Sequence, residues 1–111
     1  MPTNEAQLVG AMGRAIKKRW PSAWLFKVVG SPFQMTGVPD ILVCVEGHLV
    51  GIEAKFQRPG ESKDGALSRA TPGQLVQIER IRAAGGTADV VTTVEDAVAL
   101  VESALQKKEN D

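Results

Sequence analysis

The sequence of 111 residues is poor in the side chains that most often reveal a cofactor or a covalent mechanism. It has one cysteine, Cys44, and one histidine, His48. A single cysteine excludes an internal disulfide, and neither residue has a partner at the spacing of a zinc site. We therefore expect Cys44 to be a small apolar residue of a strand and His48 to lie at an edge or surface. No Ser-His-Asp order or phosphate-binding loop motif is present.

The chain also has no excess of charge and no long apolar run. Thirteen basic residues balance thirteen acidic ones, so any binding of a polyanion must come from a local arrangement of cations. The absence of a signal-peptide pattern and of a membrane-length apolar segment predicts a soluble cytoplasmic protein with no membrane partner. We expect a single domain over residues 1–106 and a disordered tail at 107–111, with a core small enough to gain from a partner subunit.

The stretch from Gly37 to Lys55 predicts a β-hairpin. Its two arms, 41–45 and 48–56, are rich in Ile, Val and Leu and are separated by Glu46-Gly47. A two-residue turn at this point fixes one register between the arms, whereas a type I turn with a bulge at Gly47 gives another. Because Glu46 is an unfavourable first residue for a type I′ turn, both registers stay open.

In the two-residue register, Asp40 lies opposite Glu53. Facing side chains on antiparallel strands are about 5 Å apart, and like charges at that distance are destabilising. A divalent cation between the two carboxylates would remove the repulsion. Because side chains alternate along a strand, Lys55 shares the face of Glu53, and the intervening Ala54 points to the other face. The hairpin is thus expected to have one charged face and one apolar face.

Helical spacing predicts a first helix that is capped by Thr3 and ends near Arg19. Its apolar stripe passes through Leu8 and Met12, and Glu5 falls on the same stripe. A carboxylate is unusual on a buried face, which favours a functional role for Glu5. With equal weight, an acid in a first turn can simply favour the helix dipole at a partly exposed helix end.

A second helix is predicted from Thr71 to the glycines at 85–86. Thr71 is a cap residue, Pro72 suits the first helical position, and Gln74 completes a capping box. The same Gln74 lies along the face of Ile78, which would aim it at the sheet. Capping and a role in a site are therefore equally favoured for Gln74.

The remaining segments complete an alternating pattern. Strands are predicted at 24–29 and 87–92, and a last helix begins after Thr93 and runs to about Leu105. The polar segment 57–70 is too long for a simple connection, so we expect it to be mobile and functional. The order is helix, three strands, helix, strand, helix, which predicts an α/β fold with a mixed sheet flanked by helices.

The residues of the hairpin resemble a known nuclease signature. Pro39-Asp40 followed by Glu53-Ala54-Lys55 resembles the PD-(D/E)XK motif, and the fuller pattern resembles its virus-type replication-repair nuclease (VRR-NUC) branch. The resemblance implies a restriction-endonuclease-like core and Mg²⁺- or Mn²⁺-dependent hydrolysis of DNA that leaves 5′-phosphate and 3′-hydroxyl ends. The stretches that carry it are Gly30-Ser31-Pro32, Gly37-Val38-Pro39-Asp40, Glu53-Ala54-Lys55, Gln74 and Gly85-Gly86.

The resemblance also implies roles for single residues. Asp40 and Glu53 match the metal-binding acids, and the backbone carbonyl of Ala54 would be a further ligand. Glu5 matches the helical acid, which would act on the metal directly or through water. Hard oxygen ligands of this kind suit Mg²⁺ or Mn²⁺.

Two further positions match the family pattern. Lys55 matches the lysine that orients or activates the attacking water, and Gln74 matches the glutamine on the helix after the third strand. An ammonium beside the phosphate would stabilise negative charge as it develops. The predicted catalytic set is therefore Glu5, Asp40, Glu53, Lys55 and Gln74.

Stand-alone viral members of the family imply a homodimer similar to Holliday-junction resolvases, acting on branched DNA in a bacterial or phage-infected cell. Trp20, Trp24 or Phe33 could form the interface. One alternative is a monomeric nuclease acting on flaps, ends or single strands, and another is a non-catalytic DNA-binding module with the same fold. The basic cluster from Arg14 to Arg19 could favour the helix dipole or contact a DNA backbone.

Overall fold

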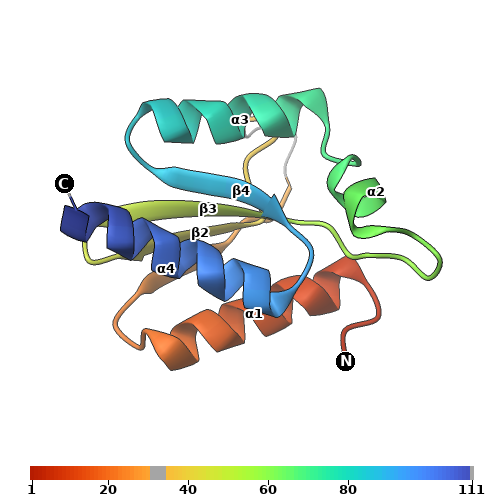
Figure 1. Ribbon diagram of the computed structural model, residues 1–111, viewed down its shortest axis with the longest axis horizontal. Helices are drawn as coiled ribbons and strands as arrows, with labels where there is room; N and C mark the ends of the chain where they lie inside the picture. Colours follow the sequence, from red (N-terminus) through yellow and green to blue (C-terminus); the bar gives the residue numbers. More distant parts are fainter. Residues whose placement is uncertain (31–34, 111) are drawn as a thin grey trace.

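A four-stranded mixed sheet forms the centre of the computed structural model, which describes residues 1–30 and 35–110 (Figure 1). The strand order is β1-β2-β3-β4; the first three strands are antiparallel, and β4 is parallel to β3. The predicted α/β fold with a mixed sheet is confirmed. The elements are α1 (Glu5–Arg19), β1 (Trp24–Lys27), β2 (Ile41–Val45), β3 (His48–Ala54), α2 (Lys63–Leu67), α3 (Pro72–Ala83), β4 (Thr87–Val91) and α4 (Val94–Asn110).

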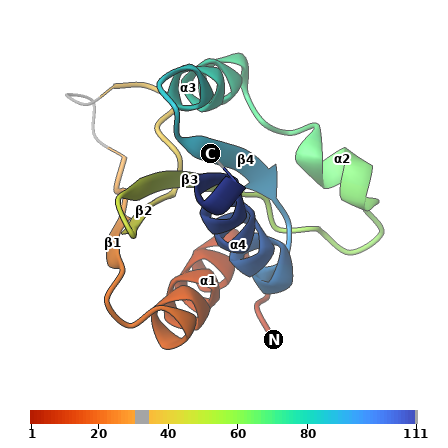
Figure 2. The same cartoon turned by 60° about the vertical axis from the view of Figure 1, so that its left-hand side comes forward.

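Helices cover the two faces of the sheet unequally. Helices α1 and α4 pack side by side on one face, and α3 lies on the other face over β3 and β4 (Figure 2). Alternation along β2 and β3 sends every second side chain toward α1 and α4, where the main core forms. Its fully or almost fully buried members include Leu8, Met12, Ile16, Ile41, Val43, Val45, Val50, Ile52, Ala54, Ala97 and Val101.

The hairpin has the two-residue turn. Glu46 has φ 50° and Gly47 has φ 78°, the left-handed pair that defines a type I′ turn. Val45 pairs with His48, and the ladder continues to Ile41 and Ile52. The register that faces the two acids is therefore the correct one, and the turn places a glutamate in a conformation that side chains rarely adopt.

The cap of the first helix differs from the prediction by one residue. Asn4, not Thr3, is the N-cap, and its side chain accepts a hydrogen bond from the Gln7 backbone N–H at 2.9 Å. Thr3 instead donates to the Gln7 side-chain oxygen from both its N–H and its hydroxyl. Asn and Thr both satisfy the orphan donors of a helix start, so adjacent cap residues compete in the sequence pattern.

The other two helix starts are as predicted. Thr71 and Gln74 form a reciprocal capping box with Pro72 in the first turn of α3. The Thr93 hydroxyl accepts from the backbone N–H of Asp96 at 3.0 Å at the start of α4. These caps account for the starts of α3 and α4, the helices before and after β4 in the chain.

The observed segments differ from the predicted ones by a missed helix and by several shifted boundaries. The segment 57–70 contains the five-residue helix α2, whose cap Ser62 accepts from the Gly65 N–H, and the sequence pattern missed it. Strands β1 and β3 each end two residues earlier than predicted. Helix α4 extends to Asn110, into the segment that was expected to be a disordered tail. Ser31, Pro32 and Phe33 lie outside the described residues.

Hydropathy along the helices agrees with the absence of a membrane-length apolar run. In residues 1–30 and 35–110, no helix is long and apolar enough to cross a membrane.

Candidate functional site

Asp40 and Glu53 meet at the end of the hairpin that is farthest from its turn. Asp40 directly precedes β2, and Glu53 is the penultimate residue of β3, so the register that pairs Ile41 with Ile52 brings the two acids opposite each other. The Asp40 Oδ2 atom accepts a hydrogen bond from the Ala54 backbone N–H at 2.8 Å. Asp40 is half-buried, whereas Glu53 is buried at 2% exposure. The backbone thus fixes one carboxylate beside the other.

Glu53 lies in an electrostatically unfavourable position. Burial, then the charge of Asp40 and hydrogen bonding to it, raise the pKa of the Glu53 carboxyl to about 8, and Lys55 offsets only part of this rise. The Lys55 Nζ atom lies 3.5 Å from the Glu53 Oε2 atom. The other carboxylate oxygen, Oε1, is buried without a hydrogen-bond partner in the described part of the chain. A buried acceptor of this kind normally has a partner.

The unpartnered oxygen indicates where a cation would fit. Two carboxylates and a nearby backbone carbonyl, that of Ala54, are hard oxygen donors of the kind that Mg²⁺ binds together with water and phosphate oxygens. Across the described residues, no group of three or more His, Cys, Asp or Glu side chains could hold an ion. Asp40 and Glu53 would therefore form an open site, in which water or substrate supplies the remaining ligands.

Glu5 does not lie on the buried stripe of α1, so that prediction is wrong. Its side chain is 46% exposed, and its Oε1 atom lies 3.3 Å from the Nη1 atom of Arg69. Glu5 is the first residue of the helix, and the buried positions begin only at Leu8. Glu5 and Lys55 nevertheless line the same surface hollow, so the helix brings its acid to the rim of the hairpin site.

The Gln74 side chain takes part in the capping box. Its Oε1 atom accepts from the Thr71 N–H at 2.9 Å, which is the structural alternative that the sequence left open. Its backbone is close to the loop that leads to Asp40. A Cβ atom on Gly37 would come within 2.8 Å of the Gln74 nitrogen, and Gly37 has φ 84°. The backbone at the start of α3 therefore supports this loop. The Gln74 side chain itself bonds to the cap residue of its own helix.

Arg69 connects the segments around the hollow, a role that the sequence did not indicate. Its guanidinium forms a fork with Glu61, with N–O distances of 2.9 and 3.1 Å, and also donates to Glu5 and to the Phe56 carbonyl. These hydrogen bonds with Glu61 and Glu5 raise the pKa of Arg69, and the one from Arg69 lowers the pKa of Glu61. Arg69 and Glu5 are 64 residues apart, and no local pattern predicts such a pair.

His48 and Cys44 remain outside this arrangement. The His48 ring nitrogen Nε2 lies 3.0 Å from the Thr87 hydroxyl at the opposite end of β3 from Lys55. Cys44 is a free, half-buried cysteine in the middle of the sheet. The structure therefore brings together Asp40, Glu53 and Lys55, with Glu5 at the rim.

Comparison with known proteins shows a similarity of fold. No family model and no curated protein matches the sequence. One similar solved structure, described as "VRR_NUC domain", is 24% identical with a TM-score of 0.57, covering 84% of this chain and 92% of that chain. Another, described as "VRR_NUC domain protein", is 17% identical with a TM-score of 0.65, covering 96% and 91%. The chain thus has the fold of the solved VRR_NUC domains, as the sequence pattern predicted.

Proposed function

We propose that this chain is a metal-dependent nuclease of the VRR-NUC type that hydrolyses phosphodiester bonds in DNA. The observation that carries the proposal is the buried oxygen of Glu53, which has no partner in the described part of the chain although Asp40 and Lys55 are beside it. A fold gains no stability from two neighbouring carboxylates and an unsatisfied acceptor, so their presence favours a function that uses them.

The residues have separate tasks in this proposal. Asp40, Glu53 and the Ala54 carbonyl would hold one Mg²⁺ or Mn²⁺ ion, which would supply Lewis-acid polarisation of the scissile phosphate. Lys55 would orient the attacking water and stabilise the negative charge that develops on the phosphate. Glu5 would act from the rim through a water molecule, held in place by Arg69.

Gln74 is the least supported member of the predicted catalytic set. Its Oε1 atom is used by the cap, which leaves the Nε2 amide hydrogens as donors toward a substrate. We retain it as a positioning residue, because its helix start supports the loop that precedes Asp40.

For the substrate, we favour branched DNA bound by a homodimer. One acidic site cuts one strand, so a symmetric four-way junction requires two sites related by a two-fold axis. An apolar surface is available for such a contact. Trp24 and Phe26 are 57% and 51% exposed, their rings stack with centroids 6.0 Å apart, and Leu49 lies on the same sheet face.

The other aromatic residues predicted for an interface offer less. Trp20 is half-buried and packs against the core, and Phe33 lies outside the described residues. Phe26 and Leu49 are exposed residues of the same sheet face as Trp24, and the sequence did not suggest them. A monomeric nuclease acting on flaps, ends or single strands is the second candidate, because the proposed site is contained in one chain.

A cleavage assay tests the proposal directly. Four-way junctions, flaps, single strands and linear duplex would be incubated with the protein in Mg²⁺, Mn²⁺ or EDTA. We expect metal-dependent cleavage that is abolished by Asp40→Asn, while that variant still binds DNA and keeps its metal-free stability. Asparagine retains an oxygen acceptor for the Ala54 N–H and removes a repulsive charge.

The outcomes separate the candidates. Cleavage of flaps by a monomer in sedimentation would favour the second candidate. DNA binding without cleavage under any of these conditions would favour a non-catalytic module, and a large loss of stability in Asp40→Asn would indicate a structural role for that residue.

A further inference from the structure

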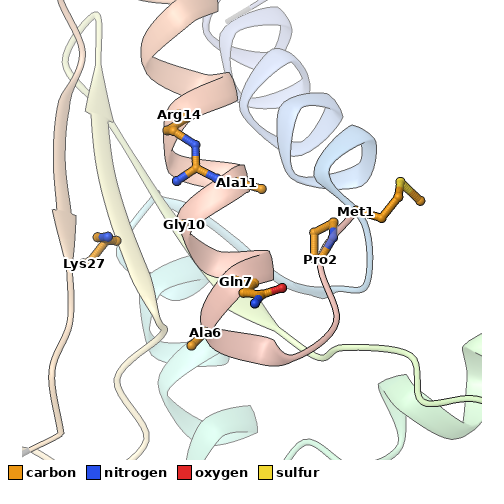
Figure 3. A pocket seen from close by; sticks show the side chains of 8 residues that line it. All are labelled: Met1, Pro2, Ala6, Gln7, Gly10, Ala11, Arg14 and Lys27. Atoms are coloured by element: carbon orange, nitrogen blue, oxygen red, sulfur yellow. The ribbon is translucent and has the colours of Figure 1, made fainter.

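A groove between α1 and β1 has the character of an anion site. It has a volume of about 480 Å³ and extends over the exposed face of α1. Figure 3 shows Lys27 of β1 on one side, Met1 and Pro2 on the other, and Arg14 of α1 between them. The residues of the helix that line it are Ala6, Gln7, Gly10, Ala11 and Arg14.

The charge of the groove has one sign. Both cations are exposed, and no carboxylate of the described residues lines the groove. In residues 1–30 and 35–110, neither Arg14 nor Lys27 forms an ion pair, whereas Arg19, Lys63 and Arg82 each contact an acid. In a chain with no net charge, two uncompensated cations that face one groove give a local positive potential.

Gly10 shapes the position of Arg14. A Cβ atom on Gly10 would lie 3.2 Å from the Arg14 Nη1 atom, so the guanidinium rests over a helix position that has no side chain. Glycine inside a helix costs about 1 kcal/mol relative to alanine. The helix thus has a residue that is unfavourable for helix stability at the position over which the Arg14 guanidinium lies.

The groove adjoins the proposed active site. The first turn of α1 separates two hollows: Glu5 lines the one that contains Lys55, and Ala6 lines the one that contains Arg14 and Lys27. At the other wall, Lys27 pairs with Ile41, the residue after Asp40. Lys27 and the acids therefore lie at the same end of the sheet, although strand alternation sends the Lys27 and Asp40 side chains to opposite faces. A DNA strand held at the acids could therefore continue over the start of α1 into the groove.

We propose that Arg14 and Lys27 bind backbone phosphates of the DNA strand that flanks the cleaved bond. This inference rests on the proposed function for its ligand. Phosphate contacts from cations on two rigid elements would fix the register of the strand without reading its sequence.

Salt-dependent binding tests the groove independently of cleavage. Anisotropy of a labelled four-way junction and of a labelled duplex would be measured in EDTA over a range of salt concentrations. Each lost phosphate contact lowers the slope of log K against log salt by about 0.9 for duplex DNA. We expect that decrease for Arg14→Ala and for Lys27→Ala, and about twice that decrease for the double variant.

Arg80→Ala is the control, because Arg80 is an exposed cation of α3 that does not line the groove. Unchanged slopes in the Arg14 and Lys27 variants, or an equal decrease in the Arg80 variant, would overturn the inference. If the proposed function is wrong, the cleavage assay will show no cleavage. The binding measurement in EDTA does not depend on cleavage, so the two failures can be told apart.

A second pair of variants tests the groove by adding charge. Ala11→Glu introduces a carboxylate into the lining of the groove and should weaken binding most at low salt. Ala83→Glu makes the same change on α3, at the other face of the sheet, and should leave affinity nearly unchanged. Equal weakening by the two variants, with both folded by circular dichroism, would contradict a local site.

Discussion

The Lys55 Nζ atom lies 3.5 Å from the Glu53 Oε2 atom, and the two side chains are 10% and 3% exposed. Such a buried pair contributes little net stability, because desolvation of both charges offsets their attraction. Burial, and then the charge of Asp40, keep the pKa of Glu53 raised even beside an ammonium. Ion pairs with a perturbed pKa are concentrated at functional sites. The contribution of each partner can be measured by replacing it.

Replacement of Lys55 separates chemistry from metal binding. We expect Lys55→Ala to lower the cleavage rate by about 100-fold or more, the usual range for loss of a group that assists proton transfer or charge development. Metal binding, followed by calorimetry, should be retained. Lys63→Ala is the control, because Lys63 pairs with Asp96 and lies outside the hairpin. An unaltered rate in Lys55→Ala would remove this residue from the mechanism.

The raised pKa of Glu53 predicts a pH dependence of stability in the metal-free protein. Between pH 4.5 and about 8, the folded protein keeps a proton on Glu53 that the unfolded chain releases. The free energy of unfolding should therefore fall as pH rises through this window, by an amount on the order of a few kcal/mol. Urea unfolding in EDTA at several pH values would measure this change.

Glu53→Gln provides the comparison for that experiment. Glutamine has no proton to release, so its stability should be nearly flat over the same window, and it should exceed that of the original protein at pH 8. A pH dependence that persists unchanged in Glu53→Gln would assign it to another group.

Arg69 should hold Glu5 and Glu61 together at the rim. We expect Arg69→Ala to lower the melting temperature and to reduce cleavage through loss of Glu5 positioning. Arg69→Lys should restore little of either, because lysine cannot reproduce the fork with Glu61.

The same ion pair should respond to pH. Since Arg69 lowers the pKa of Glu61, the pair stabilises the fold above the ordinary carboxyl range and loses this effect as Glu61 is protonated. The difference in melting temperature between the original protein and its Arg69→Ala variant should therefore shrink as pH falls below that range. A difference that is constant with pH would contradict the role of this ion pair.

The exposed rings on β1 provide a test of the proposed dimer. Trp24→Ser with Phe26→Ser should convert a dimer into a folded monomer in sedimentation velocity, because the double variant removes the two exposed aromatic side chains of the sheet face. Leu75→Ser with Val76→Ser is the matched control on α3, where these residues are 48% and 47% exposed. Loss of the dimer in the control alone would place the interface on α3.

The hairpin and its acid pair were predictable because they depend on local patterns. Strand alternation placed Glu53 and Lys55 on one face, and the Glu46-Gly47 turn limited the register to two alternatives. The sequence could not choose between these alternatives, because the choice depends on whether Glu46 tolerates a positive φ. The whole sheet resolves this question by fixing the pairing on both sides of β2.

Other features were beyond a sequence pattern. Helix α2 has five residues, too few to show a helical period, and only its Ser62 cap could have indicated it. Helical spacing assigned Glu5 to the buried stripe, but a stripe does not show where the sheet ceases to cover the helix. The pairing of Glu5 with Arg69 depends on the tertiary structure alone.

The type I′ turn makes the most exposed part of the hairpin intolerant of changes in length. Surface turns usually accept an extra residue. An insertion beside Gly47 would alter the pairing that extends over about 17 Å to Asp40, and a shift of one residue in a strand turns its side chains to the opposite face. Length variation should therefore not be tolerated at this turn, where a folded protein with a displaced acid would be the result.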